Sequence, residues 1–189
     1  MKRNNVARIA IVSAFAVVPF SGCSMYQSAV NYIRSDSAAT CPDAAILAST
    51  ATLPAFDPAK GDDPSNVLYT ISFNNVTTRC DYSKRDFTAD TSLKLFFKAT
   101  RPPGGEDAQY KVPYYVAVTN NGAIQDKQVH WLAFSFSKGD SVVSGEDDVD
   151  STVVRVDRAK KPYEYHVIVG FQLTKAQLEY NKKMGQFEP

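Results

Sequence analysis

Between Val67 and Leu173, apolar and polar residues alternate with a period of two over long stretches. Side chains two positions apart lie on the same face of a β-strand, so this alternation predicts strands with one buried face. Turn-forming glycine, proline and asparagine separate these stretches at residues 101–105, 120–122, 138–140 and 160–162. The apolar sets are Tyr69, Ile71 and Phe73; Leu93, Leu95 and Phe97; Val112, Tyr114, Val116 and Val118; Leu132, Phe134 and Phe136; and Tyr165, Val167, Val169 and Phe171.

This pattern predicts about seven strands when a shorter one at residues 152–156 is included. No convincing helix lies between the strands, which argues against a parallel sheet, because parallel strands are usually joined by crossover helices. We therefore expect an all-β fold, an antiparallel β-sandwich of immunoglobulin or fibronectin type over residues 41–174. A small closed barrel is the alternative. Residues 44–53 are apolar enough to form a first strand or a covering segment.

The period changes once more near the C-terminus. Thr174 and Gln177 have the spacing of a capping box, and Leu173 and Leu178 stand where a hydrophobic staple places its two apolar residues. The sequence therefore predicts a short C-terminal helix from Lys175 to about residue 183, followed by a loose tail, within residues 175–189.

The N-terminus has the three zones of an export signal. Lys2, Arg3 and Arg8 supply positive charge, and residues 9–20 form an apolar run. This run is shorter than the ~20 residues that a transmembrane helix needs, and Pro19 would end a helix near its close. We expect residues 1–22 to be a cleaved signal peptide.

The segment Phe20-Ser21-Gly22-Cys23 resembles the lipobox of bacterial lipoproteins, although Phe20 replaces the usual leucine. The resemblance implies cleavage before Cys23, a diacylglycerol on its thiol and an acyl chain such as palmitate on its new amino group. Ser24, where aspartate would favour inner-membrane retention, points to the outer membrane, with the protein facing the periplasm. Residues 23–40 would then be the lipidated cysteine and a flexible tether of ~20–25 Å reach. A plain secretory signal near a cysteine is the alternative.

The cysteine count fits the same interpretation. Three cysteines are an odd number for an exported protein, and assigning Cys23 to lipid leaves the pair Cys41 and Cys80. The periplasm is oxidising, so we expect these two residues to form a disulfide. Redox or zinc chemistry is the competing interpretation, but neither cysteine lies in a C-x-x-C motif, and His130 and His166 are distant in the sequence.

Charge narrows the classes of partner. Residues 1–22 hold three of the 21 basic residues and none of the 20 acidic ones, which leaves 18 basic against 20 acidic residues, or about −2. A weakly acidic, mixed-sign surface argues against a nucleic-acid partner, which requires a basic stripe. It also argues against a polybasic membrane binder, so the expected membrane contact is through the N-terminal lipid.

No motif predicts catalysis or a cofactor. The chain has no G-x-S-x-G elbow and no Walker loop, and His130 and His166 lie in strand patterns, where histidines are usually structural. Glu146, Asp147, Asp148 and Asp150 are the best metal candidates, as calcium ligands on a loop. Their spacing is not that of an EF-hand, and a solvated acidic loop is the preferred interpretation. We therefore expect a protein that is not an enzyme, with no catalytic or metal-ligating residue and no cofactor.

Aromatic residues are more numerous than one sheet face needs. Some of them must then point away from the core, which suggests a partner-docking face or a lipid- or glycan-contacting one. The alternative is that both faces of a central strand are covered within the fold. The residues concerned are Phe96, Phe97, Tyr114, Tyr115, Trp131, Phe134 and Phe136.

Three segments resemble a group of alphaproteobacterial periplasmic lipoproteins: Cys41-Pro42, residues 112–118, and residues 170–174 with Leu178. The resemblance implies a location and a fold and brings no activity or further site residue. The function we expect is that of a non-catalytic interaction module, an accessory subunit of an envelope assembly with a protein partner there. The alternative is a free-standing binding lipoprotein for an apolar or glycan ligand, which a deep aromatic cavity would favour.

Overall fold

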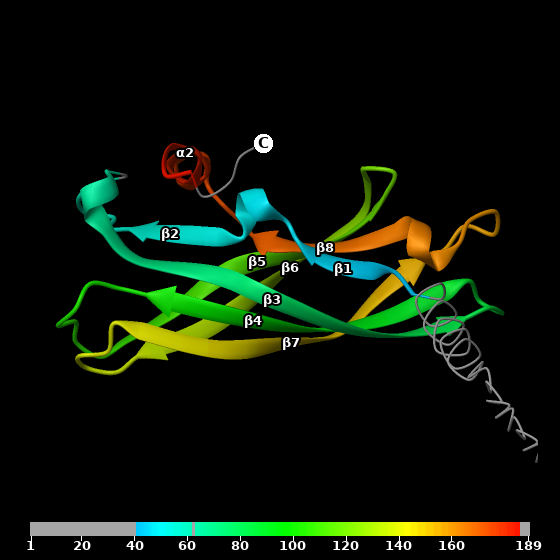
Figure 1. Cartoon of the computed structure of the whole chain (residues 1–189), viewed down its shortest axis with the longest axis horizontal. Coiled ribbons are helices and arrows are strands. Elements are labelled where there is room, and N and C mark those ends of the chain that lie inside the picture. The colour runs from blue at the N-terminus through cyan, green and yellow to red at the C-terminus, as the bar shows by residue number, and fades with distance from the viewer. Residues whose placement is uncertain (1–40, 62, 186–189) are drawn as a thin grey trace, which may run out of the picture. The chain divides into compact units, whose positions relative to one another are not determined.

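The computed structural model describes residues 41–61 and 63–185, and the structural statements below concern these residues. They fold as a β-sandwich with one short C-terminal helix, which confirms the predicted fold class (Figure 1). Short 3-10 turns lie at Ala48–Thr50 (η1), Pro64–Asn66 (η2) and Pro162–Glu164 (η3). The strands are β1 (Asp43–Ile46), β2 (Thr52–Phe56), β3 (Val67–Ser83), β4 (Thr88–Thr100), β5 (Ala108–Asn120), β6 (Ala123–Phe136), β7 (Val142–Arg155) and β8 (Tyr165–Phe171), and the helix is α2 (Lys175–Lys183).

The strands form two four-stranded sheets. One has the order β1-β8-β5-β6 and the other the order β2-β3-β4-β7. All neighbouring pairs are antiparallel except β1 and β8, which run parallel. The agreement with immunoglobulin domains is in the two-layer architecture, because here the consecutive long strands β3 and β4 pair within one sheet, whereas strands B and C of an immunoglobulin domain lie in different sheets.

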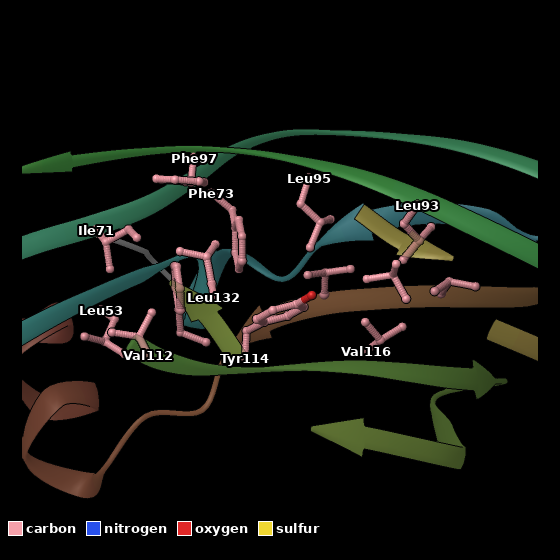
Figure 2. Close-up of a cluster of buried hydrophobic side chains, with 14 of the residues drawn as sticks. Leu53, Ile71, Phe73, Leu93, Leu95, Phe97, Val112, Tyr114, Val116 and Leu132 are labelled. Carbon is pink, nitrogen blue, oxygen red and sulfur yellow. The ribbon is translucent and has the colours of Figure 1, made fainter. Parts of the chain in front are cut away.

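The core lies between the two sheets and is made by the apolar faces that the alternation predicts (Figure 2). Ile71 and Leu95 face it from one sheet, and Val116 and Leu132 face it from the other. Phe73 of β3 and Phe171 of β8 stack across the interface with ring centroids 4.2 Å apart. Close packing of this kind between two apolar faces is what holds a β-sandwich together.

The predicted turn at residues 120–122 connects β5 to β6. Asn121 and Gly122 have φ angles of 50° and 76°, the left-handed conformation that a two-residue hairpin turn of type I′ requires. Asparagine and glycine adopt this conformation more easily than other residues, so the local sequence sets the turn and thereby the start of β6.

Helix α2 begins as the sequence predicts. The Thr174 hydroxyl accepts from the backbone N–H of Gln177, and the Gln177 side chain accepts from the backbone N–H of Thr174. The helix also covers the outer edge of β2: Gln177 Nε2 donates to the Pro54 carbonyl and Asn181 Nδ2 donates to the Thr52 carbonyl, each at 2.8 Å. These edge carbonyls of the second sheet therefore have partners.

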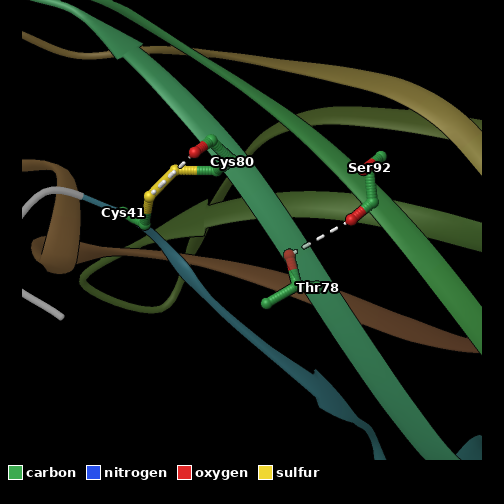
Figure 3. Close-up of a disulfide and its surroundings, with 4 residues drawn as sticks. All are labelled: Cys41, Thr78, Cys80 and Ser92. Carbon is green, nitrogen blue, oxygen red and sulfur yellow. Dashed lines mark hydrogen bonds between the residues drawn. A yellow bond between two sulfur atoms is a disulfide. The ribbon is translucent and has the colours of Figure 1, made fainter. Parts of the chain in front are cut away.

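Cys41 and Cys80 lie at disulfide distance and are joined in the structure, with their Cα atoms 6.0 Å apart (Figure 3). Cys80 belongs to β3, whereas Cys41 precedes β1, which pairs with β8 in the other sheet. The bond therefore links the residues just before β1, in one sheet, to the C-terminal end of β3, an inner strand of the other sheet.

Candidate functional site

The predicted lipid site, Cys23, and the tether at residues 24–40 lie outside the described residues. In the part of the chain that the structure describes, no helix has the length and hydropathy needed to cross a bilayer. The search for a site therefore concerns the surface of the sandwich.

Most of the aromatic residues that the sequence suggested as a surface set are buried. Phe97, Tyr114, Phe134 and Phe136 lie between the sheets, and Phe96 is half-buried. Tyr115 lies on the opposite face of β5 from Tyr114 and is covered there, because its hydroxyl hydrogen-bonds Thr50 Oγ1 of η1 at 2.9 Å. Gly170 of β8 makes room for this contact, since an added Cβ would lie 1.9 Å from Thr50 Oγ1.

Trp131 is the aromatic residue of this set that remains open to solvent, with 56% of its surface exposed. It lies on the outer face of β6 opposite Pro113, beside Val129, which is 53% exposed. Lys111 Nζ lies 5.4 Å from the Trp131 ring, and Lys127 Nζ lies 4.5 Å from the Tyr115 ring. Val129, Trp131 and the outer edge of β6 are called the β6 surface below.

The edge of β6 has no strand partner among the described residues, since β6 is the last strand of its sheet and pairs only with β5. The strand is 14 residues long, and from Ala123 to Val129 its side chains are exposed on both faces. An edge of this length presents a row of backbone N–H and C=O groups that another extended chain can pair with.

His130 contacts Tyr114, and Tyr114 in turn contacts Asp147. The His130 ring stacks on Tyr114, with centroids 5.3 Å apart, and the Tyr114 hydroxyl donates to Asp147 Oδ2 at 2.7 Å. Burial, and then the hydrogen bond to Asp147, raise the pKa of Tyr114 far above its ordinary value. A hydroxyl that holds its proton so firmly joins the sheets but is a poor proton donor, and it stays protonated where a general base would have to be free.

His166 is paired elsewhere. Its Nδ1 contacts Asp43 Oδ1 across the parallel β8–β1 pair, and both side chains are well exposed. An exposed pair of this kind helps to hold a short edge strand and forms no cleft for a substrate. Among the described residues, neither histidine hydrogen-bonds a serine, threonine or cysteine side chain.

The acidic residues 146–150 lie on strand β7, and the expectation of a loop is wrong. Alternation along a strand sends neighbouring side chains to opposite faces, so Glu146 and Asp148 point outward and Asp147 points toward Tyr114. Lys94 Nζ contacts Glu146 at 2.8 Å and Asp148 at 3.3 Å. Among the described residues, no group of three or more His, Cys, Asp or Glu side chains is placed to hold a metal ion.

Comparison with known proteins adds no assignment: the chain matches no protein-family model, no curated protein and no solved structure.

Sequence reasoning identified Trp131 as one of several candidates but missed Val129, Lys111 and the free edge beside it. Alternation shows which residues share a face, but it does not show which strand lies last in a sheet. The signal in the sequence was the stretch at residues 123–129, which has polar residues on both faces of the strand, Gln125 and Lys127 on one and Asp126 and Gln128 on the other.

Proposed function

We propose that the chain is a periplasm-facing lipoprotein, anchored through Cys23 to the outer membrane, whose sandwich is a non-catalytic interaction module of an envelope assembly. The signal-like N-terminus and the lipobox-like residues before Cys23 support the anchor. The β6 surface supports the interaction module, and it is the observation that carries the proposal.

A comparison of the four sheet edges favours β6 as the docking strand. Strand β1 offers only four residues, and the edge of β2 is covered by α2 and contains Pro54, which has no backbone N–H. Strand β7 is as long as β6 but carries Glu146, Asp147, Asp148 and Asp150, and charged side chains discourage strand pairing. Of these edges, β6 alone combines length with an exposed apolar centre, at Val129 and Trp131.

The occupant we propose is an extended segment of an envelope protein that adds as a fifth strand beside β6. Backbone hydrogen bonds along the edge would supply affinity, and apolar side chains against Val129 and Trp131 would supply specificity. Lys111 and Lys127 border this area, so an acidic residue flanking the apolar part of the segment would be favoured.

The docking strand can be tested by photo-crosslinking in intact cells. A photoreactive amino acid at Val129 should capture one envelope protein, because position 129 would lie in the interface. The matched control is Val153 of β7, which is 46% exposed and also apolar. Equal capture from positions 129 and 153 would contradict docking at β6.

A second arm separates specific pairing from proximity. Val129→Lys places a charge at the proposed interface and should abolish co-purification of the captured protein in mild detergent, whereas Val153→Lys should leave it unchanged. Retention of the complex by Val129→Lys would reject the interface. Recovery of the protein without any protein partner, but with a bound glycan or apolar molecule, would favour the alternative of a ligand-binding lipoprotein.

The anchor is tested independently by Cys23→Ala. Loss of the acyl chains should release the protein from the membrane fraction or misplace it, because each buried methylene contributes ~0.8 kcal/mol to membrane attachment. Ser28→Ala is the matched control, since it changes a nearby residue of the same segment without removing the proposed lipid or the Cys41–Cys80 disulfide. Unchanged membrane association of Cys23→Ala, measured by fractionation and mass spectrometry, would refute the anchor.

A further inference from the structure

Basic residues gather at one end of the sandwich, in the β3–β4 hairpin and the β7–β8 connection, which lie together at the right of Figure 1. These two segments line a hollow of about 580 Å³. No carboxylate lines it. The lining residues are Lys84, Arg158, Lys160 and Lys161, with Tyr82, Phe87, Pro162 and Tyr163.

The positive charges of this hollow are not neutralised by ion pairs. Within the described residues, Lys60, Lys94, Lys138 and Lys182 pair with carboxylates, and the four basic residues of the hollow do not. Positive charges gathered on a concave surface produce a positive potential that attracts anions.

The acidic residues nearby are held by their own loops. Asp157 accepts the backbone N–H of Ala159 at 2.8 Å, and Glu164 accepts that of Lys161 at 2.7 Å. Asp86, in the β3–β4 turn, likewise accepts the Ser83 hydroxyl at 2.7 Å. Among the described residues these three carboxylates form no ion pair with the basic residues of the hollow, although their charges still lower its positive potential.

Aromatic rings complete the surface. The Arg158 guanidinium lies 5.2 Å from the centre of the Phe87 ring, and Tyr163 is 52% exposed at the rim. Tyrosine rings with an apolar body and a polar tip are well suited to the boundary between lipid and water. The combination of cations and amphipathic rings fits phosphate groups displayed on a lipid surface better than it fits an isolated anion in solution.

This end of the sandwich is also the one at which the described chain begins. Cys41 is bonded to Cys80, and Lys84 follows Cys80 by four residues, or ~13 Å along an extended strand. If Cys23 carries lipid, residues 24–40 connect the bilayer to this end and not to the opposite one. A flexible linker of that length has an r.m.s. span of ~20–25 Å, which is short enough for the basic hollow to meet the membrane surface.

We propose that this basic end docks on anionic phosphate headgroups of the membrane to which the chain is tethered. The inference rests on the lipid anchor of the proposed function and adds to it a second, electrostatic contact. One lipid-attached chain and a basic surface together hold a protein more firmly, and in a more defined orientation, than either contact alone.

Lysine labelling of the full lipidated protein in lipid nanodiscs tests this contact. An amine-reactive reagent and mass spectrometry report the labelling of Lys84 and Lys161, with the exposed Lys98 and Lys183 as controls. In discs of phosphatidylcholine mixed with phosphatidylglycerol, Lys84 and Lys161 should lose labelling relative to pure phosphatidylcholine, and high salt should restore it. Lys98 and Lys183 should not change.

A pair of charge-reversed proteins provides a second readout. Backbone hydrogen exchange of residues 83–88 should be slowed by the phosphatidylglycerol discs in the unaltered protein and in Lys98→Glu/Lys183→Glu. The slowing should vanish in Lys84→Glu/Lys161→Glu. Equal urea midpoints of the two variants in detergent would show that both are folded.

The outcomes separate this inference from the anchor. A protein that stays in the discs with Lys84 and Lys161 fully labelled overturns the headgroup contact alone. A protein that does not stay in the discs contradicts the anchor and the inference together. Equal protection of the two lysines by glycerol phosphate in detergent would mean that the hollow binds a soluble phosphate, which also overturns the membrane assignment.

Discussion

The buried Tyr114 links the two sheets through its hydroxyl group. Its ring is 1% exposed, its hydroxyl reaches across the sandwich to Asp147, and His130 stacks on its face. A buried hydroxyl requires a partner, and Asp147 supplies one from the opposite sheet. The bond therefore fixes the two layers relative to each other at the side where β6 and β7 lie.

Replacing Tyr114 by phenylalanine should lower the free energy of unfolding by about 1–2 kcal/mol. A hydrogen bond to a charged group contributes roughly 1.5–3 kcal/mol, and the partial exposure of Asp147 reduces that value. Urea denaturation measures the change. Tyr115→Phe, which removes a bond between two neutral hydroxyl groups, is the matched control and should cost less. An equal or larger loss for Tyr115→Phe would contradict the importance given to the Asp147 bond.

The adjacent residues Tyr114 and Tyr115 show what the sequence can and cannot predict at this scale. Alternation places them on opposite faces of β5, and the structure confirms it. The partners of their hydroxyl groups, Asp147 and Thr50, are 33 and 65 positions away, and no local pattern identifies them. Lys94 and Glu146 are 52 positions apart, and no local pattern identified their pairing either.

Among the elements, β1 depends most on contacts made elsewhere. It is a four-residue edge strand whose only strand partner among the described residues is the parallel β8. The Cys41–Cys80 bond precedes it and the His166–Asp43 contact joins its first residue to β8. So short a strand needs such additional links to stay in place.

Removing the disulfide by Cys41→Ser with Cys80→Ser should lower the free energy of unfolding by about 4 kcal/mol, the chain-entropy value for a loop of roughly 40 residues. The loss should be concentrated in β1, where backbone hydrogen exchange should accelerate more than in β5. Ser83→Ala with Ser92→Ala is a control of equal mutation number in the same sheet. Unchanged stability, or two free thiols in non-reducing peptide mapping of the native protein, would refute a structural disulfide.

Helix α2 and strand β1 differ in how far the sequence determines them. The bounds of α2 agree with the prediction because the capping box at Thr174 and Gln177 is local. Residues 44–53 were left between a strand and a covering segment, and they divide into β1, η1 and the start of β2. Their parallel pairing with β8 depends on residues more than 120 positions away, which the expectation of an antiparallel fold did not include.

At the scale of the whole molecule, buried tyrosines make the fold sensitive to alkali. Burial, and then the charge of Tyr110, raise the pKa of Tyr69 to about 12 from its ordinary 10.0, and Tyr114 is shifted in the same direction. The folded protein thus retains these protons at a pH at which the unfolded chain loses them. The contribution of Tyr69 to the free energy of unfolding is therefore fully present below pH 10, and it is lost as the pH rises from about 10 to about 12.

The expected slope is at most about 1.4 kcal/mol per pH unit for each tyrosine. Urea unfolding at about pH 9 and about pH 11 should therefore differ, and Tyr69→Phe should reduce the difference. Tyr163→Phe, at an exposed tyrosine, should leave the difference unchanged. A difference that persists in full in Tyr69→Phe/Tyr114→Phe would show that other groups cause it.

The net charge of the sequence did not predict the basic end of the sandwich. A mature chain of about −2 argued against a basic membrane contact, yet Lys84, Arg158, Lys160 and Lys161 meet at one end. They come from two segments more than 70 residues apart, and the pairing of β4 with β7, which sets Thr88 opposite Arg155, brings these segments together. A sum over the sequence contains no information on where charges lie in space.

The disulfide also determines how the sandwich responds to mechanical load. A force applied through the N-terminal segment reaches Cys41 first, and from there the covalent bond passes it to Cys80 of β3, a strand that pairs with β4 at this point and with β2 at its other end. Without that bond the same pull would act on β1 and peel four residues away from β8 one at a time. A domain held by its N-terminus between a membrane and a partner would in this way bear tension along its longest strand, for as long as the two sulfur atoms stay joined.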